Sequence, residues 1–509
     1  MDFDKVKPVP LDAQRSPSGR QDVGPKTTGE SLRPSTTEPL QFDVTYIPEP
    51  RDRAERQNRL NSLYIRLIGL LVLIVPIPLA SHRPVPWALW SVVVACLVLG
   101  FMLRLIVREP DRKLRSLAHA DLILLALAMP AFALLQLLPL GHLVPWAFAP
   151  DLAPTAITLN TSATLFAVLR LMSYAGVFLM TMEVCSRPQR THQLARYIFY
   201  GLTAHAILAM ISLNILGDRF LWGDKTSYLG WATGTFVNRN SFASFMGLGI
   251  LTGIALVTAQ PPNTPQPRRK SHRNVLSPQM IETGIYWVCI ALMGTALVAS
   301  GSRMGLAATG IGTIVTLIAM SGHTKPESAT TSTRPRKVIL FVLVIGLTAI
   351  AILSQSVGER LIFSGVAFDT RLALYQNVWD LILTRPWTGY GLDSFELAYP
   401  LVHDDRVSPA FIWDLAHNTY LTLWAELGLI AGSASLLALA AAALRLTRAL
   451  RRSAAPSLAI ALSLGALSLA ATHSLLDFSF EIEANAMLLI VLIAMGLSQT
   501  PRRPRGGRP

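Results

Sequence analysis

This chain has few charged residues. Only 15% of its 509 residues are Asp, Glu, Lys or Arg, whereas 51% are hydrophobic, and the mean hydropathy is +0.42. So little charge excludes a single water-soluble globule. The sequence also lacks a G-x-x-x-x-G-K-[ST] loop and a G-x-G-x-x-G turn, which argues against a built-in ATPase and a Rossmann-type cofactor site.

Cysteine is scarce as well, with three residues in the chain. The three residues Cys96, Cys185 and Cys289 lie in or at the ends of apolar runs, without the spacing of metal ligands. We therefore expect them to act as small hydrophobic side chains, with no disulfide between them. We predict neither a metal site nor a bound cofactor.

The apolar residues gather in long runs that suit membrane helices. Most runs have about 17 to 25 residues, the length that an α-helix needs to cross a hydrocarbon core of roughly 30 Å. They are continuously apolar, which excludes the alternating strands of a membrane β-barrel. The sequence thus predicts an all-α polytopic membrane protein with about twelve spans, at 62–80, 86–106, 119–139, 163–184, 196–216, 240–259, 284–301, 303–320, 338–355, 416–444, 457–475 and 485–499.

The formal net charge of +14 reflects topology rather than nucleic-acid binding. Basic residues cluster in alternate connections, such as Arg104 to Arg115 and Arg445 to Arg452, and in both tails. Because cytoplasmic loops carry an excess of Lys and Arg, we place these connections and both termini in the cytoplasm. No nucleic-acid partner is expected.

This topology divides the chain into five parts. Residues 1–60 are rich in Pro, Ser, Thr and charge, which predicts a disordered cytoplasmic tail. Residues 61–354 hold spans one to nine and residues 417–499 hold spans ten to twelve. Residues 355–416 form a long outer loop, and residues 500–509 form a basic cytoplasmic tail. Because loops this long tend to be functional or disordered, the loop is the first place to look for a site.

The long loop contains a predicted amphipathic helix. Asp369, Thr370 and Arg371 can cap a helix, which Pro386 and the Gly389-Tyr390-Gly391 turn then end. Its predicted apolar face comprises Leu372, Tyr375, Val378, Trp379 and Ile382. We expect this helix to lie at the membrane interface.

Polar clusters mark three helix starts on the same outer face. They are Thr235 to Ser241, Gly301 to Arg303, and Ala416 to Tyr420. The unpaired N–H groups and positive dipole end of a helix start can hold an anion. Together with Arg371 they suggest one anion-binding cleft, in which a neutral His417 is the best candidate for a general base.

The order of several motifs resembles the O-antigen ligase and Wzy-type polymerase superfamily. The motifs are T-F-V-N-R-N-S-F-A (235–243), G-S-R-M-G-L (301–306), R-x-x-x-Y with R-P-W-T-G-Y-G-L-D-S-F (371–395), A-H-N-T-Y-L with E-L-G-L (416–429) and H-S-L-L-D-F (473–478). Members are bacterial inner-membrane glycosyltransferases. They move a glycan from an undecaprenyl diphosphate carrier to an acceptor hydroxyl at the periplasmic face, and the long loop is their hallmark.

The resemblance implies roles for individual residues. Its loop histidine corresponds to His417, the catalytic base, and its arginines correspond to Arg303 and Arg371, which would bind the diphosphate. Guanidinium groups suit this role because they bind phosphate oxygens bidentately and stay charged. Asn240 and Asn418 are predicted supporting residues. The expected reaction is inverting and independent of metal, and it takes place in the lipid bilayer with lipid A core or a growing glycan as acceptor.

Arg170 and two pairs of acids are harder to place. Arg170 lies inside a span, where it either approaches the lipid phosphate or pairs with Asp121 or another acid. The pairs Asp404-Asp405 and Glu481-Ile482-Glu483 are interpreted as solvated loop acids rather than metal ligands.

Two other functional classes remain open. Twelve spans with both termini inside also describe many secondary transporters, but we find no convincing internal repeat, and the polar cluster lies at the outer face rather than the midplane. A structural scaffold gives no reason for the arginine and histidine set. Within the resembled superfamily, the motifs favour a ligase over a polymerase only slightly.

Overall fold

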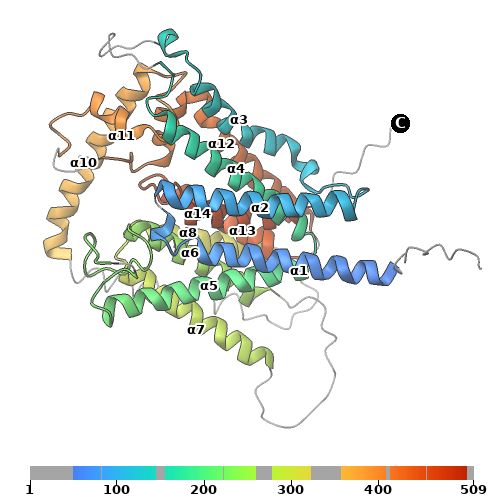
Figure 1. Ribbon diagram of the computed structural model, residues 1–509. Coiled ribbons are helices and arrows are strands. Elements are labelled where there is room, and N and C mark those ends of the chain that lie inside the picture. Colours follow the sequence, from blue (N-terminus) through green and yellow to red (C-terminus); the bar gives the residue numbers. More distant parts are fainter. Residues whose placement is uncertain are drawn as a thin grey trace, which may run out of the picture. The chain divides into compact units, whose positions relative to one another are not determined.

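The computed structural model describes residues 50–81, 83–144, 155–221, 223–259, 278–321, 357–408, 413–453 and 455–500. Within these ranges the regular elements are all helices, which confirms the predicted all-α class (Figure 1). Residues from Ala54 onward form one compact unit. The longer helices are α1 (Pro50–Ile74), α2 (Pro84–Arg108), α3 (Ala120–Gln136), α4 (Thr161–Val184), α5 (Pro188–Asn214), α6 (Arg239–Thr258), α7 (Pro278–Ala299), α8 (Arg303–Ser321), α10 (Val357–Thr384), α12 (Thr419–Arg452), α13 (Leu458–His473) and α14 (Glu483–Ser498).

Helices cover the predicted apolar runs within the described ranges, whereas the run at 338–355 lies outside them. Eight helices of the described part are long and apolar enough to cross a membrane: α2, α3 with its preceding turn, α4, α5, α6, α7, α8 and α12. Helices α13 and α14 have 16 residues each, fewer than the roughly 20 that a span needs. Length and composition thus support eight of the twelve predicted spans.

The first predicted run, 62–80, is not one helix. Helix α1 ends at Ile74, and Pro76 and Pro78 follow within the apolar stretch. Proline lacks a backbone N–H and interrupts helical hydrogen bonding, so the chain turns here. The indole of Trp90 donates to Ser81 Oγ at 2.8 Å and ties this turn to α2.

Helix α6 forms the centre of the bundle. It packs against α5, α7, α8 and α13, and 16 of its 20 residues are buried. Helices α8 and α13 approach each other through small residues. A Cβ atom on Gly312 would lie only 2.8 Å from the carbonyl oxygen of Gly465, and the reverse distance is the same. Such close backbone contact is typical of membrane helix pairs, which gain stability mainly by van der Waals packing.

Helix α12 is broken at Gly428, whose φ of 73° and ψ of 168° are not helical. The turn that follows α10 fills the break: Leu429 N–H donates to Pro386 O at 2.7 Å, and Tyr390 N–H donates to Ala425 O at 3.0 Å. A side chain at Gly428 would meet the carbonyl oxygen of Trp387 at 2.5 Å. The positive φ and this close approach together require glycine.

Helix α10 begins earlier than predicted. It starts at Val357, so residues 369–371 lie inside the helix rather than at its start, but it ends at Thr384 before Pro386 as expected. Of the predicted apolar face, Val378 and Ile382 are buried, whereas Leu372 and Trp379 are 49% and 42% exposed. Leu374 and Leu381 are buried as well.

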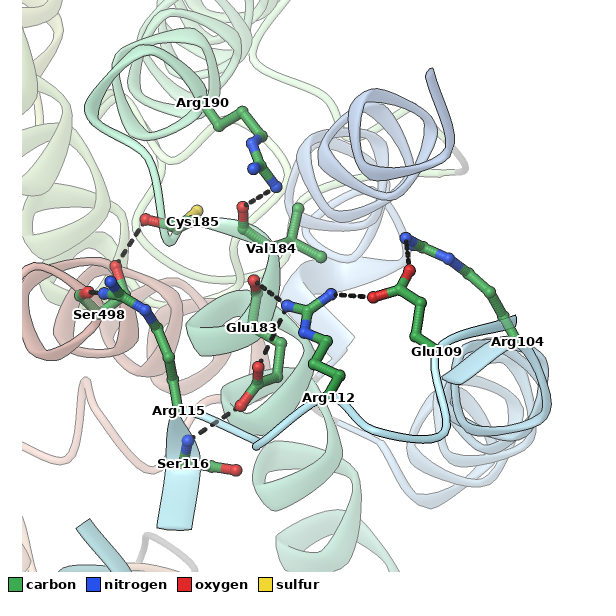
Figure 2. Close-up of polar contacts among 10 residues, drawn as sticks. All are labelled: Arg104, Glu109, Arg112, Arg115, Ser116, Glu183, Val184, Cys185, Arg190 and Ser498. Atoms are coloured by element: carbon green, nitrogen blue, oxygen red, sulfur yellow. Dashed lines mark hydrogen bonds and ion pairs between the residues drawn. The ribbon is translucent and has the colours of Figure 1, made fainter. Parts of the chain in front are cut away.

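Charged side chains from α2, α4 and the segments next to them meet at one end of the bundle (Figure 2). Arg112 bonds Glu109 at 2.7 Å and the buried Glu183 at 3.2 Å. Glu183 also accepts the Ser116 N–H at 2.9 Å, and Arg115 donates to the Ser498 carbonyl at the end of α14. Basic residues that mark the predicted cytoplasmic side thus close this end of the bundle with buried ion pairs.

Candidate functional site

The turn between α13 and α14 joins the starts of α6 and α12. Asn418 caps α12 with its side-chain oxygen, and its Nδ2 donates to Leu475 O at 2.9 Å. Asn240, in the first turn of α6, donates from Nδ2 to Asp477 Oδ2 at 2.7 Å. The structure thus brings together two of the predicted supporting residues, at the opposite end of α14 from the ion pairs in Figure 2.

His417 lies immediately before this helix cap, with a positive φ of 52°. Its ring packs edge-on against Phe478, with the centroids 4.9 Å apart, and against Trp413 at 5.9 Å. The Tyr375 hydroxyl on α10 donates to the His417 carbonyl at 2.9 Å. Ring atom Nδ1 is buried and has no hydrogen-bond partner among the described residues. The loop helix, the α13–α14 turn and the α12 cap therefore fix this imidazole together.

The surroundings keep His417 neutral. Burial is the main cause and lowers its pKa below the ordinary value for histidine. The carboxylates of Asp477 and Asp414 oppose this shift, while the positive charge of Arg371 adds to it. A neutral imidazole can accept a proton near neutral pH, which is what a general base requires.

Arg371 supplies positive charge to the same cluster. Its guanidinium lies close enough to act electrostatically on His417, Tyr375 and Tyr228. Burial raises the pKa of Tyr375 to about 12, although Arg371 opposes the shift. The Tyr375 phenol therefore stays protonated and remains a donor to the His417 backbone. Arg371 lies one turn before Tyr375 on α10, and the Tyr375 hydroxyl bonds the His417 carbonyl, so the two predicted residues belong to one cluster and their roles stay predictions.

Arg303 is less closely connected. It is exposed, and it is the first residue of α8, where Ser302 Oγ accepts the Gly305 N–H at 3.1 Å. Gly305 packs directly against Ala243 of α6, one turn beyond Asn240. This contact places the starts of α6 and α8 on the same side of the bundle. Among the described contacts none joins Arg303 to His417, so its role stays a prediction.

Arg170 belongs to a different cluster. Its guanidinium lies 3.8 Å from Asp393 in the turn after α10, and 4.2 Å from the ring centroid of Trp87. Asp121 pairs with Arg445 instead. Of the two interpretations, the structure shows an ion pair with an acid, although the partner is not Asp121.

The interpretation of Glu483 as a solvated acid is wrong. Glu483 is fully buried, because the turn before α14 folds back between helices. Glu481 is half-buried, and burial raises its pKa to about 8, although the positive charge of Arg170 opposes the shift. Asp404, by contrast, pairs with Arg406 at 2.6 Å in an exposed position.

Sequence reasoning missed Asp477. This carboxylate accepts a hydrogen bond from Asn240, accepts another from Ser479 Oγ at 2.6 Å, and opposes the lowering of the His417 pKa. The H-S-L-L-D-F motif contains Asp477, but the sequence did not show that the turn would face His417. Arg239, in the first turn of α6, lies 4.9 Å from the ring centroid of Trp231. In the described part of the chain, no three His, Cys, Asp or Glu side chains are grouped to hold a metal ion.

Apolar helices surrounding a charged cluster define a multi-pass membrane protein with a polar site at one end of its bundle. A family model described as O-antigen ligase matches residues 288–436, from α7 to the first half of α12. The match confirms the resemblance to the O-antigen ligase and Wzy-type polymerase superfamily over this segment and supports an enzyme of a bacterial membrane. No curated protein matches the chain.

Proposed function

We propose that the protein transfers a glycan from an undecaprenyl diphosphate carrier to an acceptor sugar hydroxyl at the periplasmic face of the inner membrane. One observation carries the proposal: the segment that matches the O-antigen ligase model contains a half-buried histidine whose pKa is lowered by burial, and the positive charge of Arg371 adds to that shift. The identities of donor and acceptor rest on the family resemblance.

In this mechanism His417 acts as the general base. A ring nitrogen takes the proton of the acceptor hydroxyl while the oxygen attacks the anomeric carbon of the donor sugar. The bond from that carbon to the diphosphate oxygen breaks, and undecaprenyl diphosphate leaves. A single in-line displacement inverts the configuration and needs no covalent enzyme intermediate.

The arginines stabilise the leaving group. Negative charge on the diphosphate grows as the glycosidic bond breaks, and fixed guanidinium groups lower the energy of that state. Arg371 is the better supported of the two because its charge already reaches His417. Arg303 would bind the same diphosphate from the start of α8.

Two acceptors are compatible with this chemistry. A ligase would use a sugar of the lipid A core, and a polymerase would use the growing end of another lipid-linked repeat. We favour the ligase because the matching model is described as O-antigen ligase. A transporter is less well supported, because the polar residues gather around helix starts rather than at mid-helix.

A transfer assay tests the base. His417→Ala should abolish transfer from a lipid-linked glycan while donor binding and protein levels stay near wild type, because only the proton acceptor is lost. His142→Ala, at an exposed position in the turn after α3, is the matched control and should transfer normally. Normal transfer by His417→Ala would refute the assignment.

Gene deletion separates the two acceptors. Loss of a ligase should leave full-length polymer on the carrier lipid and a bare lipopolysaccharide core. Loss of a polymerase should leave single repeat units and no long chains. The second pattern would overturn our preference for the ligase.

A further inference from the structure

A groove lined by arginines and apolar side chains lies between α1 and α2, at the end of the bundle where Arg104 and Arg112 pair with Glu109. It has a volume of about 610 Å³ and is lined by Arg59, Leu60, Leu63, Tyr64, Leu103, Arg104, Val107 and Arg108. Its residues lie outside the segment that matches the family model and take no part in the proposed transfer.

Arg104 is the buried one of the three arginines that line the groove, and Figure 2 shows its bond to Glu109. Its side chain is only 7% exposed, and Nη2 donates to Glu109 at 2.7 Å. Its Nε and Nη1 are buried and find no acceptor within the described part of the chain. A buried guanidinium with unused N–H groups favours an added anionic acceptor, because unpaired buried donors are costly.

The charged side chains that line the groove are basic. Arg59, Arg104 and Arg108 line it, and Glu109, which bonds Arg104, also bonds Arg112 at 2.7 Å and is thus shared between two arginines. Guanidinium groups suit a phosphate, which they bind with paired hydrogen bonds.

The walls of the groove are apolar and face outward. Leu63 on α1 is 46% exposed, and Leu103 and Val107 on the apolar helix α2 are 52% and 70% exposed. A free phosphate ion would gain nothing from these side chains. A phospholipid would be stabilised by both kinds of side chain, because its phosphate would contact the arginines and an acyl chain would cover the apolar side chains.

We propose that this groove binds an anionic glycerophospholipid of the bilayer. Basic pockets between membrane helices on the cytoplasmic side are suited to such headgroups, and the basic residues here place the groove on the predicted cytoplasmic side. The bound lipid supplies the missing acceptors to Arg104 and covers the exposed leucines.

Native mass spectrometry of the purified, delipidated full-length chain tests the proposal. Phosphatidylglycerol should bind more tightly than phosphatidylcholine of the same chain length. Arg108→Gln should weaken phosphatidylglycerol binding about fivefold, and Arg104→Gln/Arg108→Gln more strongly, with little change for phosphatidylcholine. Arg108 is exposed, so the single variant keeps the test valid if loss of Arg104 prevents folding.

Arg451→Gln/Arg452→Gln is the matched control, because it removes two exposed arginines at the end of α12 and outside the groove. The proposal fails if this control weakens binding as much as the groove variants, or if both lipids bind equally. If glycerol phosphate binds as tightly as phosphatidylglycerol, the groove binds the phosphate alone and the apolar side chains add nothing, which would contradict a lipid site. A photoreactive residue at position 107 should label a phospholipid in membranes; labelling of the chain's own first 49 residues or of another protein would also overturn it.

Discussion

The side chain of Gln136, at the end of α3, should be needed to hold the broken part of α12. It is fully buried, and its Nε2 donates to the carbonyls of Thr388 and Glu426, each at 2.8 Å. Its Oε1 accepts the Leu392 N–H at 3.1 Å. One amide thus bonds α12 just before the break at Gly428 and the turn after α10 that fills the break.

The cost of Gln136→Leu follows from these contacts. Leucine has a similar size but can make none of the three hydrogen bonds. Glu426 O keeps a donor, the Gly391 N–H at 2.9 Å, whereas Thr388 O and Leu392 N lose the partners described for them. Each buried group left without a partner costs about 1 to 3 kcal/mol, so the variant should lose roughly 2 to 6 kcal/mol.

Thermal unfolding of purified protein in detergent, followed by tryptophan fluorescence at one fixed scan rate, measures this loss. Gln136→Leu should lower the apparent melting temperature by several degrees. Gln279→Leu is the matched control, because Gln279 is exposed on α7 and such surface changes usually stay within about 0.5 kcal/mol. If both variants unfold at the melting temperature of the wild type, the hydrogen bonds of Gln136 do not stabilise the break in α12.

Three further predictions concern the candidate site and the topology. Because burial lowers the pKa of His417 and Asp477 opposes this shift, transfer should be level around pH 7 and fall only at a pH below the ordinary pKa of histidine. Asp477→Asn should move that fall to still lower pH, and an unchanged pH profile would show that Asp477 does not act on the base. Arg371→Lys should transfer far more slowly than wild type although its charge is kept, whereas wild-type rates would exclude a bidentate diphosphate contact. Single cysteines at Asp404 and Pro265 should react with an impermeant thiol reagent from opposite sides of the membrane, and labelling from one side would reject the predicted topology.

Much of the fold could be predicted because helix length and apolar content depend on local sequence. Membrane helices satisfy their own backbone hydrogen bonds, so each apolar run folds as a helix wherever it packs. The errors have tertiary causes. The sequence could not show that α10 begins at Val357, or that Leu374 and Leu381 are buried while Leu372 and Trp379 are exposed, because the packing partners of a helix decide which of its side chains the protein covers.

The site was predicted less completely than the fold. His417 and Arg371 stand out in the sequence because a polar residue at the start of an apolar helix, or on a helix of a long outer loop, is a candidate for a binding or catalytic role. Asp477 gave no such signal, since a carboxylate in a short turn between two helices is usually solvated. Its importance comes from a fold that carries the turn to Asn240, more than 200 positions earlier in the chain.

The segment that matches the family model does not contain the whole cluster. Residues 288–436 include His417 and Arg371, but Asn240 and Asp477 lie outside it on either side. The described helices supply a structural reason: α6 is the most buried span, and α13 packs against both α6 and α8, so the turn after α13 is held at the start of α6. The apolar core thus positions the carboxylate that acts on His417. Changes deep in that core, such as a larger residue at Gly312 or Gly465 where α8 meets α13, should therefore reach the site by displacing the turn that carries Asp477.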